Sequence, residues 1–222
     1  VAEGWYIFPV PILSLSDRNF NVWWNEFNRS FKRVNYGLDW SQLNLTGRAD
    51  ALKAKAQFGY TNQYELAYRS PGLNRSRTLG LEARLSYSRA HELSYKTTAN
   101  KLEFLKIRET WQLEQIVASV TLISRPKLFK SQSFTLEYRD NFVADTIAKV
   151  LNPDYFLNAN TRQRHFSAVY SFSIDYRDIR PYPLKGWRAI VEIRKNGLLP
   201  SDDLQIFRAF AEWDQYISFN KW

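Results

Sequence analysis

Histidine, the side chain most often used for proton transfer, occurs only twice in this 222-residue sequence, and cysteine is absent. Hydrolysis by a serine or an activated water would need a histidine beside a nucleophile and a carboxylate. His91 precedes Glu92 in an expected loop and His165 opens an expected strand, with no nucleophile motif near either. No ligand cluster surrounds them to suggest a metal site. We therefore expect a protein that is not an enzyme and that uses no cofactor or metal.

The first segment, an apolar run over residues 5–15, contains Pro9 and Pro11. Proline has no backbone N–H, so these two residues change the hydrogen bonding that the segment can make. The residue types there favour strands, and each proline pushes the residue before it to extended angles. Two positions that are two residues apart point the same way, so both missing N–H groups would face one neighbouring strand. The segment is then an edge or seam strand, or alternatively a lead-in loop before the first strand.

A short turn rich in proline and glycine lies between two segments of alternating sequence, residues 166–177 and 187–194. In both segments apolar side chains occupy every second position, and most of the residues between them are polar. A period of two predicts strands with one face against an apolar medium and the other in water. The unit is therefore expected to be a hairpin.

The same alternation recurs along the chain and predicts about ten strands joined as successive hairpins. The expected strands cover residues 5–15, 34–43, 51–60, 64–69, 79–88, 110–124, 133–143, 166–177, 187–194 and 204–219. Short turns alternate with mostly longer, more polar connections, and residues 90–109 have room for a small hairpin of their own. This asymmetry is typical of an all-β, transmembrane, antiparallel up-and-down β-barrel.

The composition excludes some classes of protein, but it does not identify a binding partner. The net charge is +9 and aromatic residues make up 16% of the chain. A membrane helix is excluded because no run of eighteen apolar residues occurs, whereas barrel strands hide their hydrophobicity in alternation. A soluble β-sandwich would also alternate. A sheet that binds RNA or single-stranded DNA would need aromatic and basic side chains on one face, and here they mostly fall on opposite faces.

Aromatic residues stand near the expected strand ends, as an interfacial girdle on a membrane barrel would require. In a soluble sandwich the same residues would be ordinary core. The candidates for the membrane interface are Trp5, Tyr60, Tyr64, Tyr182, Trp187 and Trp222.

Three motifs occur in a recognisable order. The first two are residues 44–48, NLTGR, and residues 60–64, YTNQY. The third is the hairpin turn with Asp175, Arg177, Asp178, Pro183, Lys185 and Gly186. Together they resemble the superfamily of outer-membrane barrel-assembly proteins that includes BamA and TamA, in its Bacteroidota branch. The third motif is similar to that family's Asp-x-Arg-Asp, Pro-x-Lys-Gly turn near the middle of the barrel.

The resemblance implies a barrel of sixteen strands in the outer membrane of a Gram-negative bacterium. About ten strands are expected here, so residues 1–222 would form one barrel domain that is incomplete at its C-terminus. The family's Val-Arg-Gly-Phe/Tyr element does not occur in the sequence. The periplasmic POTRA domains of the family are expected upstream and are absent from this chain.

The function that the resemblance implies is the insertion and folding of β-barrel client proteins through a lateral seam. The seam would be formed by the first strand, at Ile7, Phe8, Pro9, Val10, Pro11 and Ile12. The alternatives are a polypeptide-secretion channel of the same superfamily and a passive outer-membrane pore. The implied partners are membrane lipid and lipopolysaccharide, unfolded clients and accessory assembly subunits, without nucleic acid.

Overall fold

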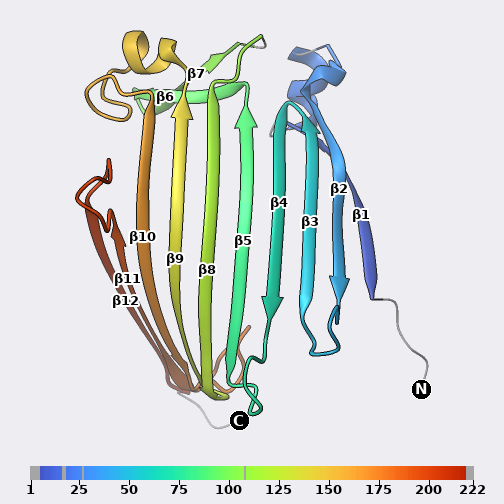
Figure 1. The fold of residues 1–222 in the computed structure, drawn as a ribbon, viewed down its shortest axis with the longest axis vertical. Helices are drawn as coiled ribbons and strands as arrows, with labels where there is room; N and C mark the ends of the chain where they lie inside the picture. The colour runs from blue at the N-terminus through green and yellow to red at the C-terminus, as the bar shows by residue number, and fades with distance from the viewer. Residues whose placement is uncertain (1–5, 17–18, 27, 108, 219–222) are drawn as a thin grey trace.

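A single antiparallel sheet of ten strands dominates the computed structural model, which describes residues 6–16, 19–26, 28–107 and 109–218. The strands follow chain order, each bonded to the next (Figure 1). They are β1 (Ile7–Leu15), β2 (Val34–Leu43), β3 (Ala51–Gly59), β4 (Thr61–Ser70), β5 (Leu79–Ala90), β8 (Leu113–Lys127), β9 (Lys130–Val143), β10 (Arg162–Asp175), β11 (Gly186–Asn196) and β12 (Ile206–Tyr216). The expected all-β, up-and-down architecture is confirmed, and the sheet is open, with β1 and β12 as its outer strands in the described part of the chain.

The two ends of the sheet differ, as the lengths of the connections predict. At one end, which we call the loop end, lie the short helical segments η1 (Val22–Glu26), η2 (Phe31–Arg33) and η3 (Ile147–Leu151) and the separate hairpin β6 (Glu92–Thr98) and β7 (Lys101–Lys106). The other end, the turn end, carries the connections after β2, β4, β8 and β10 (Figure 1). No helix among the described residues is long and apolar enough to cross a membrane.

Strand registers place the apolar side chains on one face of the sheet, which we call the apolar face. Residues paired across neighbouring strands share a face, so one row can be followed from strand to strand. One such row on this face is Leu66, Leu85, Ala118, Tyr138 and Phe166. Its large aliphatic members are more than half exposed. A soluble monomer rarely exposes so continuous an apolar surface.

The opposite face, the polar face, carries the charged and hydroxyl side chains. One row across it is Lys53, Ala67, Arg84, Ser119, Glu137, Ser167 and Asn196. Ion pairs lie on this face, such as Arg84 with Glu65 at 3.4 Å. Several of its members are buried, including Ala67, Ser167 and Asn196.

Some strand boundaries differ from the sequence-based expectation. The expected link at residues 61–63 is the start of β4, so Tyr60 alone separates β3 from β4. The expected turn at residues 125–130 contains only Leu128 and Phe129, because β8 continues through an irregularity near Pro126. Residues 90–109 do hold a small hairpin, β6–β7.

Candidate functional site

Strand β1 is the candidate site that the sequence singled out, and it lies at an edge of the sheet. It pairs with β2 over nine residues, from Ile7 opposite Gln42 to Leu15 opposite Val34. No strand in the described part of the chain pairs with its other side. An unpaired strand edge is a template for another strand.

The hydrogen bonds at the two ends of β1 show which residues point toward β2. Leu43 N–H donates to the Tyr6 carbonyl at 2.7 Å, and Ser16 N–H donates to the Arg33 carbonyl at 2.9 Å. Because successive residues of a strand point their N–H and C=O groups to opposite sides, the even-numbered residues bond β2. The odd-numbered residues of β1 therefore point to the open edge.

Pro9 and Pro11 are both odd-numbered, so the N–H groups they lack would have pointed to the open edge and not to β2. The edge residues are Ile7, Pro9, Pro11, Leu13 and Leu15. Each supplies a carbonyl, but only the three that are not proline supply an N–H. The β1–β2 ladder is intact while the outer edge is short of donors.

Side chains of β1 are apolar on both faces, unlike those of the other strands. Ile7 and Leu13 lie on the apolar face, whereas Phe8, Val10 and Ile12 project from the face that is polar elsewhere. Phe8 and Val10 are exposed. The side chains of β1 therefore do not divide into an apolar and a polar face as those of the other strands do.

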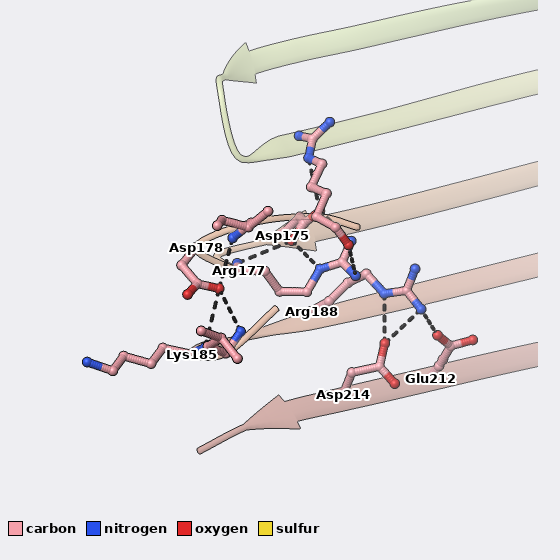
Figure 2. A network of polar contacts seen from close by, with 10 residues as sticks. Asp175, Arg177, Asp178, Lys185, Arg188, Glu212 and Asp214 are labelled. Carbon is pink, nitrogen blue, oxygen red and sulfur yellow. Dashed lines mark hydrogen bonds and ion pairs between the residues drawn. The ribbon is translucent and has the colours of Figure 1, made fainter. Parts of the chain in front are cut away.

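The turn between β10 and β11 is the second candidate, and a polar network holds it (Figure 2). Asp178 Oδ1 accepts the N–H groups of Ile179, Leu184 and Lys185 at 2.8, 3.0 and 3.2 Å. These bonds, that from Ile179 first, hold the pKa of Asp178 below its ordinary value because they favour the carboxylate. Lys185 thus contributes its main chain, and its carbonyl also accepts the Asp178 N–H at 3.1 Å.

Arginine side chains extend this network. Arg177 binds Asp175 through two nitrogens, Nε and one terminal nitrogen, at 2.8 and 2.9 Å, and Arg180 lies 3.3 Å from the same carboxylate. On the next strand Arg188 donates to Asp214 at 2.8 Å and also contacts Glu212, which connects β11 to β12 (Figure 2). A bidentate arginine–carboxylate pair fixes geometry as well as charge.

Backbone conformation explains the glycine of this motif. Gly186 has φ +103°, and a Cβ at this position would run into the Tyr176 carbonyl. Only glycine adopts such angles readily. Pro183 lies in the same turn. The motif therefore fixes the conformation of the turn between β10 and β11.

Aromatic side chains form two groups on the apolar face, one near each end. Toward the loop end, the rings of Tyr36, Phe58, Tyr64 and Tyr87 contact one another in sequence, with centroids 5.5 to 6.2 Å apart. Toward the turn end, Tyr176, Trp187 and Trp213 do the same at 5.1 and 4.6 Å. The apolar stretch of β10 runs from Phe166 to Tyr176, the residue directly after the strand. A strand of this length rises about 33 Å, or about 25 Å along the barrel axis if the strand is tilted by about 40°.

The expected interface aromatics fall in different places. Tyr64 and Trp187 belong to the two groups on the apolar face, and Tyr182 is exposed in the turn. Tyr60 does not lie on that face, since its side chain is buried among polar groups. Trp5 and Trp222 lie outside the described residues. Sequence reasoning passed over Tyr36, Phe58, Tyr87, Tyr176 and Trp213, although their place in the alternation marks them.

Tyr60 joins three separate segments at the loop end. Its hydroxyl donates to Glu92 at 2.6 Å and accepts from Arg33 at 3.3 Å. Glu92 also binds Lys106 at 3.0 Å. Burial and the bond to Glu92 raise the pKa of Tyr60 to about 12, because both disfavour the phenolate.

The two histidines lie apart. His91 stacks on Trp111 with centroids 3.7 Å apart, and its Nδ1 lies 3.0 Å from the Thr110 carbonyl. His165 is buried on β10. Among the residues that the structure describes, no group of histidine and carboxylate side chains could hold a metal.

An up-and-down antiparallel sheet with one exposed apolar face, one polar face and aromatic groups near both ends is the wall of a β-barrel of the outer-membrane type. The comparisons with known proteins name the family. The Omp85 superfamily domain matches residues 44–222, and the chain belongs to this superfamily.

A solved structure shares the fold. It is the crystal structure of BamA from Haemophilus ducreyi lacking POTRA domains 1–3, with a TM-score of 0.56 and 15% sequence identity over 96% of this chain. The chain spans 37% of the length of that protein. A search of curated proteins found no match.

Proposed function

We propose that this chain is part of an outer-membrane assembly factor of a Gram-negative bacterium, and that it inserts and folds β-barrel clients along the open edge of β1. The observation that carries the proposal is the position of Pro9 and Pro11, whose nitrogens point away from β2. A barrel normally removes its edges by closing. Here the donor-poor edge closes weakly and so remains available to a client strand.

Membrane location is supported by the apolar face and its two aromatic groups. The apolar stretch of β10 from Phe166 to Tyr176, about 25 Å along the axis of a tilted barrel, matches the apolar band of an outer-membrane barrel. Lipid is then the partner of the apolar face, and lipopolysaccharide and accessory subunits meet the loops and turns. The polar face lines a wet interior.

In the proposed mechanism a client strand adds to β1 by β-augmentation. The edge offers carbonyls at all five odd-numbered positions and N–H groups at Ile7, Leu13 and Leu15. In lipid an unpaired peptide group costs several kcal/mol, so the client gains by pairing there before its own sheet is complete. Because the ladder lacks two donors, the client can leave again once it has closed on itself.

The experiment that tests the proposal replaces Pro9 and Pro11 with valine in the full-length protein. Valine restores both edge N–H groups, so closure is strengthened and client insertion slows. The measurement is the rate at which a radiolabelled client barrel becomes heat-modifiable in proteoliposomes. Unchanged insertion in a correctly folded variant would refute the role of this edge.

A passive pore is the second candidate, and the charged polar face favours it. A pore would conduct ions across a planar bilayer with the same conductance in the wild type and in P9V/P11V, and it would not accelerate client folding. Client folding that depends on the edge prolines separates the two functions.

A further inference from the structure

Two lysines lie on the apolar face at its turn end. Lys130 pairs with Ile174, and the same row continues through Ala189 to Trp213. Lys127 stands directly opposite Lys130 in the β8–β9 ladder. Residues paired across neighbouring strands share a face. Both lysine side chains therefore project on the side of the sheet that carries Ile174 and Trp213.

The lysine pair has no counter-charge within the described part of the chain. No ion pair there joins either lysine to a carboxylate, and Asp175, whose N–H donates to the carbonyl of Phe129 in this turn, is paired with Arg177 and Arg180. Like charges directly opposite each other destabilise a sheet. The Cβ atoms of an opposed pair are about 4.5 to 5.5 Å apart, so both ammonium groups can reach one anion, which would remove the repulsion.

Aromatic rings connect this turn to the aromatic group at the turn end of the apolar face. Phe129 lies between the two lysines in sequence, and the centroid of its ring is 5.3 Å from that of Tyr176. Tyr176 in turn contacts Trp187. Aromatic side chains of this kind lie at the level of the lipid headgroups in membrane proteins. The lysine pair therefore lies near the depth of lipid phosphates when the apolar face contacts a bilayer.

The surroundings of the lysine pair indicate what kind of anion fits. Leu128 and Phe129 both expose apolar side chains beside the lysines. An inorganic anion would leave this apolar surface in water, whereas a lipid covers it while its phosphate meets the ammonium groups. Lysine suits this position because its methylene groups lie along apolar surface and its charge reaches the headgroup region. Two positive charges favour a headgroup with a net negative charge over a zwitterionic one.

We propose that Lys127 and Lys130 bind the phosphate of an anionic phospholipid in the leaflet on the turn side, and that Phe129 and Tyr176 pack against its glycerol and upper acyl groups. This site rests on the membrane location proposed above. It does not depend on client insertion at the edge of β1, because β8 and β9 are not neighbours of that strand.

The test is native mass spectrometry of the full-length protein in detergent, titrated with phosphatidylglycerol or phosphatidylcholine, because this method resolves individual bound lipids. The variant K127Q/K130Q removes both charges, K127R/K130R keeps them, and R48Q/R75Q removes two arginines from other turns at the same end. We expect the tightest phosphatidylglycerol to bind K127Q/K130Q about tenfold or more weakly than the wild type, which corresponds to about 1.4 kcal/mol. K127R/K130R and R48Q/R75Q should keep the wild-type affinity.

Vesicle flotation separates this site from the membrane location on which it rests. A wild type that does not insert into phosphatidylcholine vesicles would contradict the membrane location, whereas insertion without any preference for phosphatidylglycerol in the titration would overturn the lysine site alone. K127Q/K130Q should melt no lower than the wild type, because the substitution removes a repulsion. Equal phosphatidylglycerol affinity of K127Q/K130Q, lost affinity in R48Q/R75Q, or displacement of the lipid by inorganic phosphate at constant ionic strength would also overturn the proposal.

Discussion

Replacing Pro9 and Pro11 with valine changes the open edge of β1 in a way that can be quantified. Each valine restores one N–H that points away from β2. A hydrogen bond contributes about 0.5 to 1.5 kcal/mol net, so two new bonds strengthen a closed seam by about 1 to 3 kcal/mol. This corresponds to a shift of about fivefold to about 150-fold in the equilibrium between the closed and open seam.

Hydrogen–deuterium exchange on the full-length protein in nanodiscs measures this shift. Peptides covering residues 6–16 should exchange more slowly in P9V/P11V, by a factor within that range, because amides at Ile7, Leu13 and Leu15 are protected whenever the seam is closed. Exchange in β2 should not change. Equal or faster exchange of the β1 edge amides would refute the assignment of the proline nitrogens to the outer side.

The direction of each residue supplies a matched control. Leu13 points its N–H to the open edge, whereas Ser14 points its N–H to β2. L13P should therefore weaken only the seam, and S14P should break the β1–β2 ladder and expose β2 amides as well. If both variants change β2 exchange equally, the assigned directions are wrong.

The remaining predictions concern the turn and the loop end. D178N should destabilise the β10–β11 turn at neutral pH. Because the pKa of Asp178 is lowered in the fold, its stabilisation is present above the ordinary carboxyl pKa and is lost as pH falls through the lowered pKa, so melting curves of D178N and wild type should converge in acid. Y60F should lower stability by about 1 to 2 kcal/mol in denaturant unfolding, since Glu92 loses its buried donor, and should remove a phenol titration near pH 12 from the absorbance spectrum. G186A should cost about 1 to 3 kcal/mol by the same unfolding assay, because its Cβ meets the Tyr176 carbonyl; unchanged stability would contradict the strain.

Alternation predicted the strands where a segment is amphipathic, as at residues 79–88, because the two faces of the sheet contact different media. It failed at the start of β10, which begins at Arg162 instead of Phe166. The first residues of β10 extend beyond the end of β11. Carboxylates from the loop between β11 and β12 accept their N–H groups instead: Asp203 accepts the Arg164 N–H at 2.7 Å and Asp202 accepts the Phe166 N–H at 3.3 Å. Such long-range side-chain bonds leave no periodic signal.

The candidate site was only partly predictable for a similar reason. Spacing alone established that Pro9 and Pro11 point the same way. The direction depends on the bonds that Tyr6 makes with Leu43 of β2 and that Ser16 makes with Arg33, the residue directly before β2. Likewise, the position of Tyr60 at a strand end predicted an interfacial aromatic, whereas the partner Glu92 that draws it inward is distant in sequence. Sequence patterns report the environment of a strand and not the register between strands.

The distribution of donors along β1 also sets a direction of unzipping. The half near the turn end, from Ile7 to Pro11, has one N–H among its three outward residues, whereas Leu13 and Leu15 near the loop end keep both of theirs (Figure 1). A strand paired with the open edge of β1 therefore separates first at the end where N–H donors are few. A chain that arrives from the turn side therefore first meets the part of the edge with the fewest hydrogen bonds, and then the part near the loop end where both donors are present.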